Sequence, residues 1–352
     1  MTFAQQNRHV AVAVHQPQAA ADPTPALVAN SERKRESFSA SVLMMRPRWF
    51  IAMLAVTLAA ATLAACGSGD GGASGHPAIV ATTTQVGDFA REVAGDRARV
   101  RQILSSNSDP HAYEPRPSDI RALTSARVVL RSGGDLDEWL GDVLHNAGSK
   151  AKTVTLIDAV RTRKGEGGVD PHWWQDPRNA AIAVAKIRDA LIAADAGGRA
   201  AYNANAARYL AKLRAQDHAI AACIRQVPKP QRKLVTDHDA LGYFADRYGI
   251  QVIGTVIPAL SSQAQSSAGD VARLVRTIRQ AGVSTIFAES SANPKLAEAI
   301  ARDAGASVGQ PLYADSLGPE GSDGATYLGS LRANTRALVA GFTNGRTRCD
   351  QL

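Results

Sequence analysis

The chain has few aromatic residues, and its charge is not gathered in patches of one sign. Aromatics make up 5% of its 352 residues, and the Lys and Arg side chains behind the net charge of +8 are interspersed with Asp and Glu. A nucleic-acid-binding surface combines a basic stripe with aromatic side chains on which bases stack. We therefore expect no nucleic-acid partner and interpret the charge as an ordinary solvated surface.

The apolar run near the N-terminus is short. It extends from Phe50 to Ala65, whereas a membrane-spanning helix needs roughly 20 apolar residues. Arg46 and Arg48 precede the run and small residues lead from it into Cys66, which together predict a secretory signal. This junction resembles the lipobox of bacterial lipoproteins, which implies that Cys66 is diacylated and anchors the mature protein to the membrane. The alternative is an ordinary signal peptide with an incidental Cys.

These features divide the N-terminal part of the chain into three segments. Residues 1–44 precede a complete signal, are polar and show no periodicity, so we expect them to be untranslated, with the start at Met44 or Met45, or else disordered. Residues 45–65 form the expected lipoprotein signal peptide. Residues 66–76 are rich in Gly and Ser and are expected to be a flexible tether.

Short β-branched runs alternate with helical patterns in the rest of the chain. This alternation is typical of parallel sheets covered by helices. Two such stretches, 77–201 and 228–348, flank a helical pattern over 202–227, so we predict an α/β fold with two Rossmann-like lobes joined by a long rigid helix. Strands are expected at 78–82, 99–104, 128–130, 154–157, 234–236, 252–256, 285–288 and 308–312, and helices at 87–94, 118–126, 136–146, 240–248, 271–281, 294–304 and 326–342, besides a long helical region over 179–227 that is broken near 197–198.

Cysteine is rare, with three residues in the whole chain. Apart from Cys66, the chain contains Cys223 at the end of the connecting helical pattern and Cys349 near the C-terminus. Outside the cytoplasm such a pair can form a disulfide. Two free buried thiols are the alternative that the sequence leaves open.

Three of the eight His residues have contexts that favour metal binding. His111 and His172 each end an Asp-Pro-His tripeptide, and His238 follows an expected strand directly. Open α/β sheets bind ligands beyond the carboxyl ends of their strands, and neutral imidazole is a common nitrogen ligand for zinc. Each His taken alone could be a hydrogen-bonded loop residue, but three in equivalent contexts indicate a metal site. His145 and His218 lie in helical patterns and are expected at the surface.

The sequence around these His residues closely resembles a known family. The motif Asp-Pro-His-Ala-Tyr-Glu-Pro-Arg-Pro-Ser-Asp from Asp109 and the motif Asp-Pro-His-Trp-Trp-Gln-Asp-Pro from Asp170 resemble signatures of the TroA-like zinc- and manganese-binding lipoproteins of ABC importers. The resemblance continues through 238–244, 286–290 and 313–318 and covers about residues 77–345. It implies a metal held between the two lobes, by His111 and His172 from the first lobe and by His238 and Asp315 from the second, with Glu289 behind the ligands.

The resemblance also implies which metal is bound and with which partner the protein works. Relatives that prefer manganese commonly have a carboxylate at the position of His238, so we predict zinc as the transported metal and weaker binding of manganese. Some zinc-specific relatives have an acidic residue before the first His and a His- and Asp-rich loop before the second. Here those places hold Pro110 and the segment 161–168, so we expect no metal-gathering loop. The implied protein is an extracytoplasmic monomer that delivers its metal to a membrane permease.

Four other functions remain as alternatives. One is a manganese-specific protein of the same family, and another is an adhesin-like surface lipoprotein. A zinc hydrolase with Glu289 as general base is disfavoured, because four protein ligands would leave no coordination position for the attacking water. A siderophore- or corrinoid-binding protein would need a cleft lined by aromatic or Arg side chains rather than converging His residues. We therefore predict a binding protein and not an enzyme.

Overall fold

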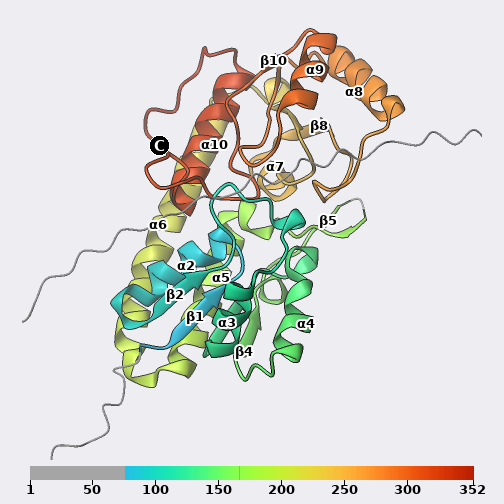
Figure 1. The fold of residues 1–352 in the computed structure, drawn as a ribbon. Helices are drawn as coiled ribbons and strands as arrows, with labels where there is room; N and C mark the ends of the chain where they lie inside the picture. Colours follow the sequence, from blue (N-terminus) through green and yellow to red (C-terminus); the bar gives the residue numbers. More distant parts are fainter. Residues whose placement is uncertain (1–75, 166) are drawn as a thin grey trace, which may run out of the picture. The chain divides into compact units, whose positions relative to one another are not determined.

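The computed structural model describes residues 76–165 and 167–352 (Figure 1). The expected leader, the signal peptide, Cys66 and the tether up to residue 75 lie outside the described residues. Within the described part of the chain, no helix is both long enough and apolar enough to cross a membrane.

The first lobe contains a four-stranded parallel sheet with the strand order β2-β1-β3-β4. Ile79 of β1 lies opposite Val100 of β2 and Val128 of β3, and the apolar residues of β1 and β3 are buried because helices cover both faces of the sheet. This arrangement confirms the α/β prediction for the lobe. Its strands are β1 (Ala78–Ala81), β2 (Arg99–Gln102), β3 (Val128–Arg131) and β4 (Lys152–Thr155), and its helices are α2 (Thr84–Ala94), α3 (Pro117–Ser125), α4 (Trp139–Asn146) and α5 (Pro177–Ala194).

A long helix, α6 (Arg199–Arg225), joins the two lobes. It begins after a turn of 3₁₀ helix at Ala196–Gly198, close to the break that the sequence predicts. It packs against α2 and α5 of the first lobe and against α10 of the second, as Figure 1 also shows. Tyr202, Tyr209 and Leu213 form part of its buried face. Because both lobes pack along one continuous helix, wide hinge bending between them would require this helix to bend.

The second lobe is built around short parallel strands. Leu234 of β7 pairs with Val252 of β8, and isolated bridges join Thr236 to Phe287 and Glu289 to Leu312. The first bridge pairs the end of β7 with the segment that follows β9, and the second pairs that segment with the one that follows β10. The carboxyl ends of β7 and of these two segments therefore lie together. The strands are β7 (Lys233–Thr236), β8 (Gln251–Thr255), β9 (Thr285–Ile286) and β10 (Ser307–Val308), and the helices are α7 (Gly242–Tyr248), α8 (Ala268–Ala281), α9 (Lys295–Ala304) and α10 (Tyr327–Phe342).

The structure differs from the sequence-based expectation in several local boundaries. The strand expected at 154–157 lies at Lys152–Thr155, and Ile157–Ala159 forms a 3₁₀ turn instead. The helix expected at 136–146 begins only at Trp139, after another 3₁₀ turn. A small antiparallel hairpin of β5 (Lys164–Gly165) and β6 (Gly168–Val169) was not expected. A Cβ atom at Gly165 would lie 2.6 Å from Leu260, so the hairpin is packed closely against the second lobe by a contact that local sequence does not reveal.

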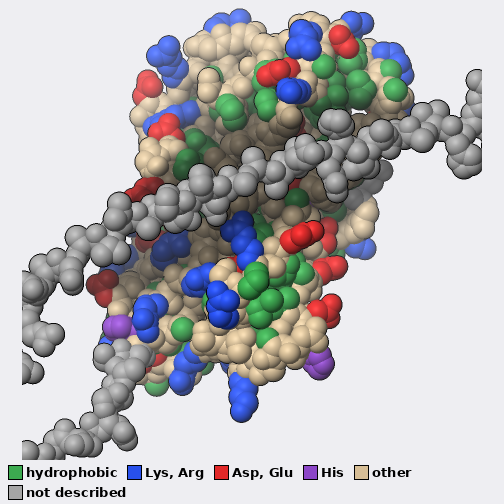
Figure 2. Space-filling view, in the orientation of Figure 1, with side chains coloured by type: hydrophobic (Ala, Val, Ile, Leu, Met, Phe, Trp, Pro, Cys, Tyr) green, Lys and Arg blue, Asp and Glu red, His purple; other side chains and the backbone are tan. Residues whose placement is uncertain are grey.

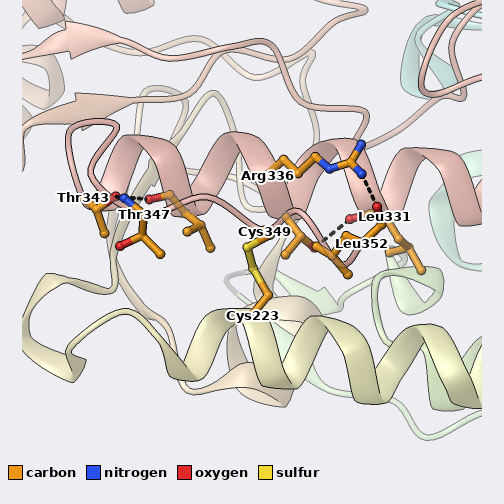
Figure 3. Close-up of a disulfide and its surroundings, with 9 residues drawn as sticks. Cys223, Leu331, Arg336, Thr343, Thr347, Cys349 and Leu352 are labelled. Atoms are coloured by element: carbon orange, nitrogen blue, oxygen red, sulfur yellow. Dashed lines mark hydrogen bonds between the residues drawn. A yellow bond between two sulfur atoms is a disulfide. The ribbon is translucent and has the colours of Figure 1, made fainter.

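The structure joins Cys223 and Cys349 by a disulfide bond (Figure 3), with their Cα atoms 5.7 Å apart. Both side chains are buried. Cys223 lies near the end of α6, and Cys349 lies in the segment that follows α10. The C-terminal segment is held further by hydrogen bonds from Arg336 to the carbonyl of Leu352 and from the amide of Thr347 to Thr343. The bridge therefore ties the end of the chain to the helix that joins the lobes.

Charged side chains of both signs are mixed over the face of the molecule seen in Figure 2. Most ion pairs that Lys and Arg form among the described residues involve at least one exposed partner, and such pairs contribute little to stability. The pair formed by Asp217 of α6 and Arg247 of α7 is more buried, with side chains 11% and 25% exposed. Asp217 Oδ1 also accepts a hydrogen bond of 2.8 Å from the hydroxyl of Tyr248. These contacts fix the connecting helix to the second lobe.

Replacing Asp217 by Asn is expected to destabilise the protein at neutral pH by about 2 kcal/mol, the scale of a hydrogen bond to a charged group. Burial alone would raise the pKa of Asp217, but Arg247 and Tyr248 outweigh burial and lower it. The contribution of the carboxylate is therefore present above the ordinary carboxyl pKa and is lost as pH falls through the lowered pKa. Denaturant unfolding of both proteins from pH 7 to below pH 4 checks this. If the difference in unfolding free energy between the parent and the Asp217→Asn variant stays constant over this pH range, the prediction is wrong.

Candidate metal centre

The first Asp-Pro-His motif lies in the loop between β2 and α3. Asp109 caps a turn of 3₁₀ helix at Pro110–Ala112, and its Oδ1 accepts a hydrogen bond of 2.9 Å from the backbone amide of His111. Pro110 fixes the backbone at the first position of this turn. The short turn, with its own cap, orients the His111 side chain toward the second lobe, where it lies 3.3 Å from Asp315.

The second Asp-Pro-His motif repeats this geometry and adds a contact to the imidazole ring. Asp170 Oδ1 accepts hydrogen bonds from the backbone amide of His172 at 2.9 Å and from its Nδ1 at 2.7 Å. Because Nδ1 donates to a carboxylate, Nε2 carries the free lone pair and is available as a metal ligand. A turn of 3₁₀ helix at Trp173–Gln175 follows directly.

In the second lobe, Glu289 holds both candidate ligands. Its Oε1 accepts a hydrogen bond of 2.6 Å from the backbone amide of Asp315, and its Oε2 lies 3.4 Å from Nδ1 of His238. The amide of Glu289 in turn donates to Asp237 Oδ2 at 2.6 Å. His238 and Glu289 follow β7 and β9, and Asp315 follows Leu312, so these residues lie beyond the carboxyl ends of neighbouring strand segments.

The four side chains that the sequence predicts as ligands converge on one point. Nε2 of His111 and Nε2 of His238 lie 3.3 and 3.2 Å from Asp315 Oδ2. Nε2 of His172 lies 3.2 Å from Asp315 Oδ1 and 3.4 Å from Nε2 of His111. One ligand atom from each residue can be chosen so that all four lie within 4.8 Å of one another. A zinc tetrahedron with bonds of about 2.0–2.1 Å has edges of about 3.3–3.4 Å, close to the shorter of these distances.

This cluster is buried and contains polar atoms without partners. The side chains of His111, His172, His238 and Asp315 are at most 3% exposed. Within the described residues, both carboxylate oxygens of Asp315 and Nε2 of His238 have no hydrogen-bond partner. Buried polar atoms are costly when they are unsatisfied. A divalent cation bound by these lone pairs would satisfy them, so the residues present fit a metal ion.

The electrostatics of the cluster favour positive charge between the residues. Burial raises the pKa of Asp315, but the neighbouring imidazoles of His238 and His172 outweigh burial and hold it well below its usual range. Burial opposes protonation of His172, but Asp315 and Asp170 outweigh it and raise the pKa of His172 to about 10. Burial and the adjacent charge of Asp315 raise the pKa of Glu289 to about 8. The negative charge of Asp315 therefore favours positive charge at this point, which protons on the imidazoles supply without metal and which a bound divalent cation would supply by displacing those protons.

The structure also gives the positions of the other residues that the sequence analysis considers. His145 and His218 are exposed on helices, as expected. Glu289 lies behind His238 and Asp315 and faces Nδ1 of His238 rather than the point where the ligands converge. The carboxylate contacts of Asp109 and Asp170 were missed, although the repeated spacing of Asp two residues before each His is visible in the sequence.

Comparisons with known proteins agree with this fold. The family model of the periplasmic zinc-uptake complex component A, ZnuA, matches residues 79–341. The chain is 32% identical over 299 residues to the manganese-binding lipoprotein MntA of Bacillus subtilis (strain 168), covering 82% of this chain and 97% of that protein. It is 30% identical over 268 residues to the iron-binding protein YfeA of Yersinia pestis, covering 75% and 86%. The solved structure of the periplasmic zinc binding protein TroA from Treponema pallidum matches with a TM-score of 0.72 at 26% identity, covering 76% of this chain and 99% of that one.

The fold and these comparisons define an extracytoplasmic metal-binding protein of an ABC importer, a class that works with a membrane permease and an ATPase. Within this class, the chain belongs to the ZnuA family. It is therefore a binding protein and not an enzyme, and the hydrolase alternative is not supported. The relatives are named for manganese, iron or zinc, so family membership alone does not select the metal.

Proposed function

We propose that the protein captures Zn²⁺ outside the cytoplasm and delivers it to the membrane permease of an ABC importer. The observation that carries this proposal is the convergence of three imidazole Nε2 atoms on the Asp315 carboxylate in a buried site. His111 and His172 would bind the ion from the first lobe, and His238 and Asp315 from the second. Because the site is enclosed, the lobes must separate to release the ion to the permease.

The chemistry of the ligands supports zinc over manganese. Imidazole suits zinc, whereas manganese is the harder ion and is suited by oxygen ligands, and zinc also lies above manganese in intrinsic affinity. Manganese-binding lipoproteins named MntA are 31% and 32% identical to this chain, which makes manganese the competing ion to test. An equilibrium titration of the protein with both ions present tests the proposal. Displacement of bound zinc by equimolar manganese would overturn it.

Replacing His238 by Glu is expected to shift the preference toward manganese. The substitution leaves two imidazoles and provides two carboxylates, a harder ligand set. We expect the ratio of zinc to manganese affinity to fall by at least about ten-fold, measured by competition with a chelator. The exposed substitution His218→Glu is the matched control and should leave the ratio unchanged. An unchanged ratio in the His238→Glu variant would argue against His238 as a ligand.

The anchor at Cys66 is a separate part of the proposal. One acyl chain holds a protein only marginally at a membrane, whereas two hold it stably, so a diacylated Cys66 should keep the protein in the membrane fraction. Replacing Cys66 by Ser is expected to release the protein or to block its processing, which cell fractionation and mass spectrometry of the mature N-terminus measure. Full membrane retention without a lipid mass on the parent protein would rule out this anchor. We expect the released protein to be a monomer.

A further inference from the structure

Each Asp-Pro-His motif has a carboxylate with two separate roles. One of its oxygens contacts the His of its own motif, which is a candidate metal ligand. Its second oxygen contacts a different part of the protein. Asp170 Oδ1 accepts from the amide and the ring of His172. Its Oδ2 accepts a hydrogen bond of 2.6 Å from Nη1 of Arg163. The side chain of Asp170 is fully buried, so its charge is compensated by His172 and Arg163 together.

Arg163 links Asp170 to the second lobe. It precedes the hairpin of β5 and β6 in the first lobe, and its Nε donates to Asp246 of α7 at 3.1 Å. The guanidinium also lies 5.8 Å from the centre of the Tyr243 ring. The hydroxyl of Tyr243 accepts from the amide of Arg163 at 3.0 Å and donates to the carbonyl of Asp170 at 2.9 Å. A Cβ atom at Gly242 would overlap the guanidinium, so the start of α7 is shaped to receive Arg163.

The first motif is held across the lobes in a similar way. Asp109 Oδ1 accepts from the amide of His111. Asp109 Oδ2 accepts from the hydroxyl of Ser262 at 2.6 Å and from the side-chain amide of Gln263 at 3.1 Å. Ser262 and Gln263 lie between β8 and α8 of the second lobe. Both His residues of the first lobe are thus positioned by a carboxylate that the second lobe holds directly or through Arg163.

We propose that these contacts form two interlobe latches, one through Arg163 and one through Ser262 and Gln263, that control the rate of metal release. When the lobes separate, Asp109 and Asp170 lose their second-lobe contacts, so opening loosens the supports of His111 and His172 at the same time. This inference rests on the proposed function, because it requires that His111 and His172 bind the transported metal. Arg163 is a positioning residue, because it acts through Asp170 and does not touch the ion.

The fork of the guanidinium is essential to the latch through Arg163. Nη1 pairs with a buried carboxylate and Nε with a carboxylate of the other lobe, Asp246, whose side chain is 69% exposed. The exposed pair contributes little by itself, whereas loss of the buried pair would leave the Asp170 carboxylate without its guanidinium partner and with His172 alone to hold it. Lys is a single point charge and cannot hold both carboxylates in this geometry. A Lys at position 163 should therefore keep the contact with Asp170 and weaken the link between the lobes, because it would lose Asp246 and keep only the longer contact of 3.8 Å that Nη1 makes with Asp239.

The test is the rate at which zinc, and separately manganese, leaves the full-length protein into excess chelator. Replacing Arg163 by Ala is expected to accelerate release about ten-fold or more, the scale of losing an outer partner of a metal ligand, and replacing it by Lys is expected to accelerate release by a smaller factor, because Lys keeps the contact with Asp170. Gly242→Ala, a change in the second lobe alone, should also accelerate release because it displaces Arg163. Arg161→Ala is the matched control, since Arg161 is exposed and forms no ion pair among the described residues, and it should release metal at the parental rate.

Two further measurements separate positioning from folding and complete the test. The unfolding temperature of each metal-free variant shows whether the replaced residue has a purely structural role. Loss of such a role would lower the unfolding temperature without selectively changing the rate of metal release. Ser262→Ala combined with Gln263→Ala should accelerate release through the other latch. If the parent binds metal and the Arg163, Gly242 and Ser262/Gln263 variants all release it at the parental rate, the latches are refuted and the proposed function stands. If the parent binds neither ion, both proposals fail.

Discussion

Replacing His172 by Ala is expected to lower the zinc affinity of the protein by more than about 100-fold. Loss of an outer partner of a metal ligand costs about 10–100-fold in affinity, and this substitution removes a ligand itself. It also leaves Asp315 Oδ1 without its nearest imidazole, which lies 3.2 Å away in the structure. His111→Ala and His238→Ala should weaken binding similarly, because each removes one Nε2 atom from the same cluster.

Competition with a chelator measures this loss, and thermal unfolding provides an independent measurement. A metal that binds only the folded state stabilises it by an amount that grows with the logarithm of its affinity, so zinc should raise the unfolding temperature of the parent more than that of the His172→Ala variant. His145→Ala is the matched control, since His145 is exposed on α4. If all three ligand variants bind zinc like the parent, the assignment of the site is wrong.

Removing the disulfide by the double substitution Cys223→Ala and Cys349→Ala is expected to destabilise the protein by about 4–5 kcal/mol. The two residues are separated by 126 positions, and the chain-entropy account assigns an increasing constraint to longer loops. The unfolding temperature should fall by about 7–9 °C, given an unfolding entropy of about 2.1 cal/mol/K per residue. Metal affinity should change little, because neither Cys belongs to the ligand cluster.

Unfolding of the parent with and without reductant is the control for this prediction. Reduction should reproduce the loss of stability in the parent and should leave the Ala variant unchanged. Alkylation of the non-reduced, unfolded mature protein provides the chemical check. Two reactive thiols at Cys223 and Cys349 would show that the bridge does not form, and an equal stability of parent and variant would show that it does not stabilise the fold.

The candidate site was largely predictable because most of its signal is local. The two Asp-Pro-His tripeptides and the position of His238 after a strand are visible in the sequence, and the structure brings all three His residues together. Asp315 could not be predicted from its local sequence. It is one of 32 acidic residues and has no distinctive neighbours, so only the resemblance to a known family singled it out.

The contacts between the lobes could not be predicted in this way. The link from Asp170 through Arg163 to Asp246 depends on how the hairpin of β5 and β6 packs against the second lobe. The predicted limits of β4 differ from those in the structure for a related reason. Pairing with β3, and not the apolar pattern of the sequence, decides that Lys152–Thr155 form this strand. Periodicity predicts the type of an element, and tertiary contacts set its limits.

The most direct test of the central claim is elemental analysis of the protein purified from its native producer without added metal. The account predicts zinc at about one ion per chain, consistent with four ligands that converge on a single point. The zinc should be absent from the His172→Ala variant prepared in the same way. Manganese or iron in place of zinc, or a parent protein that contains no metal and takes up none on titration, would contradict the account.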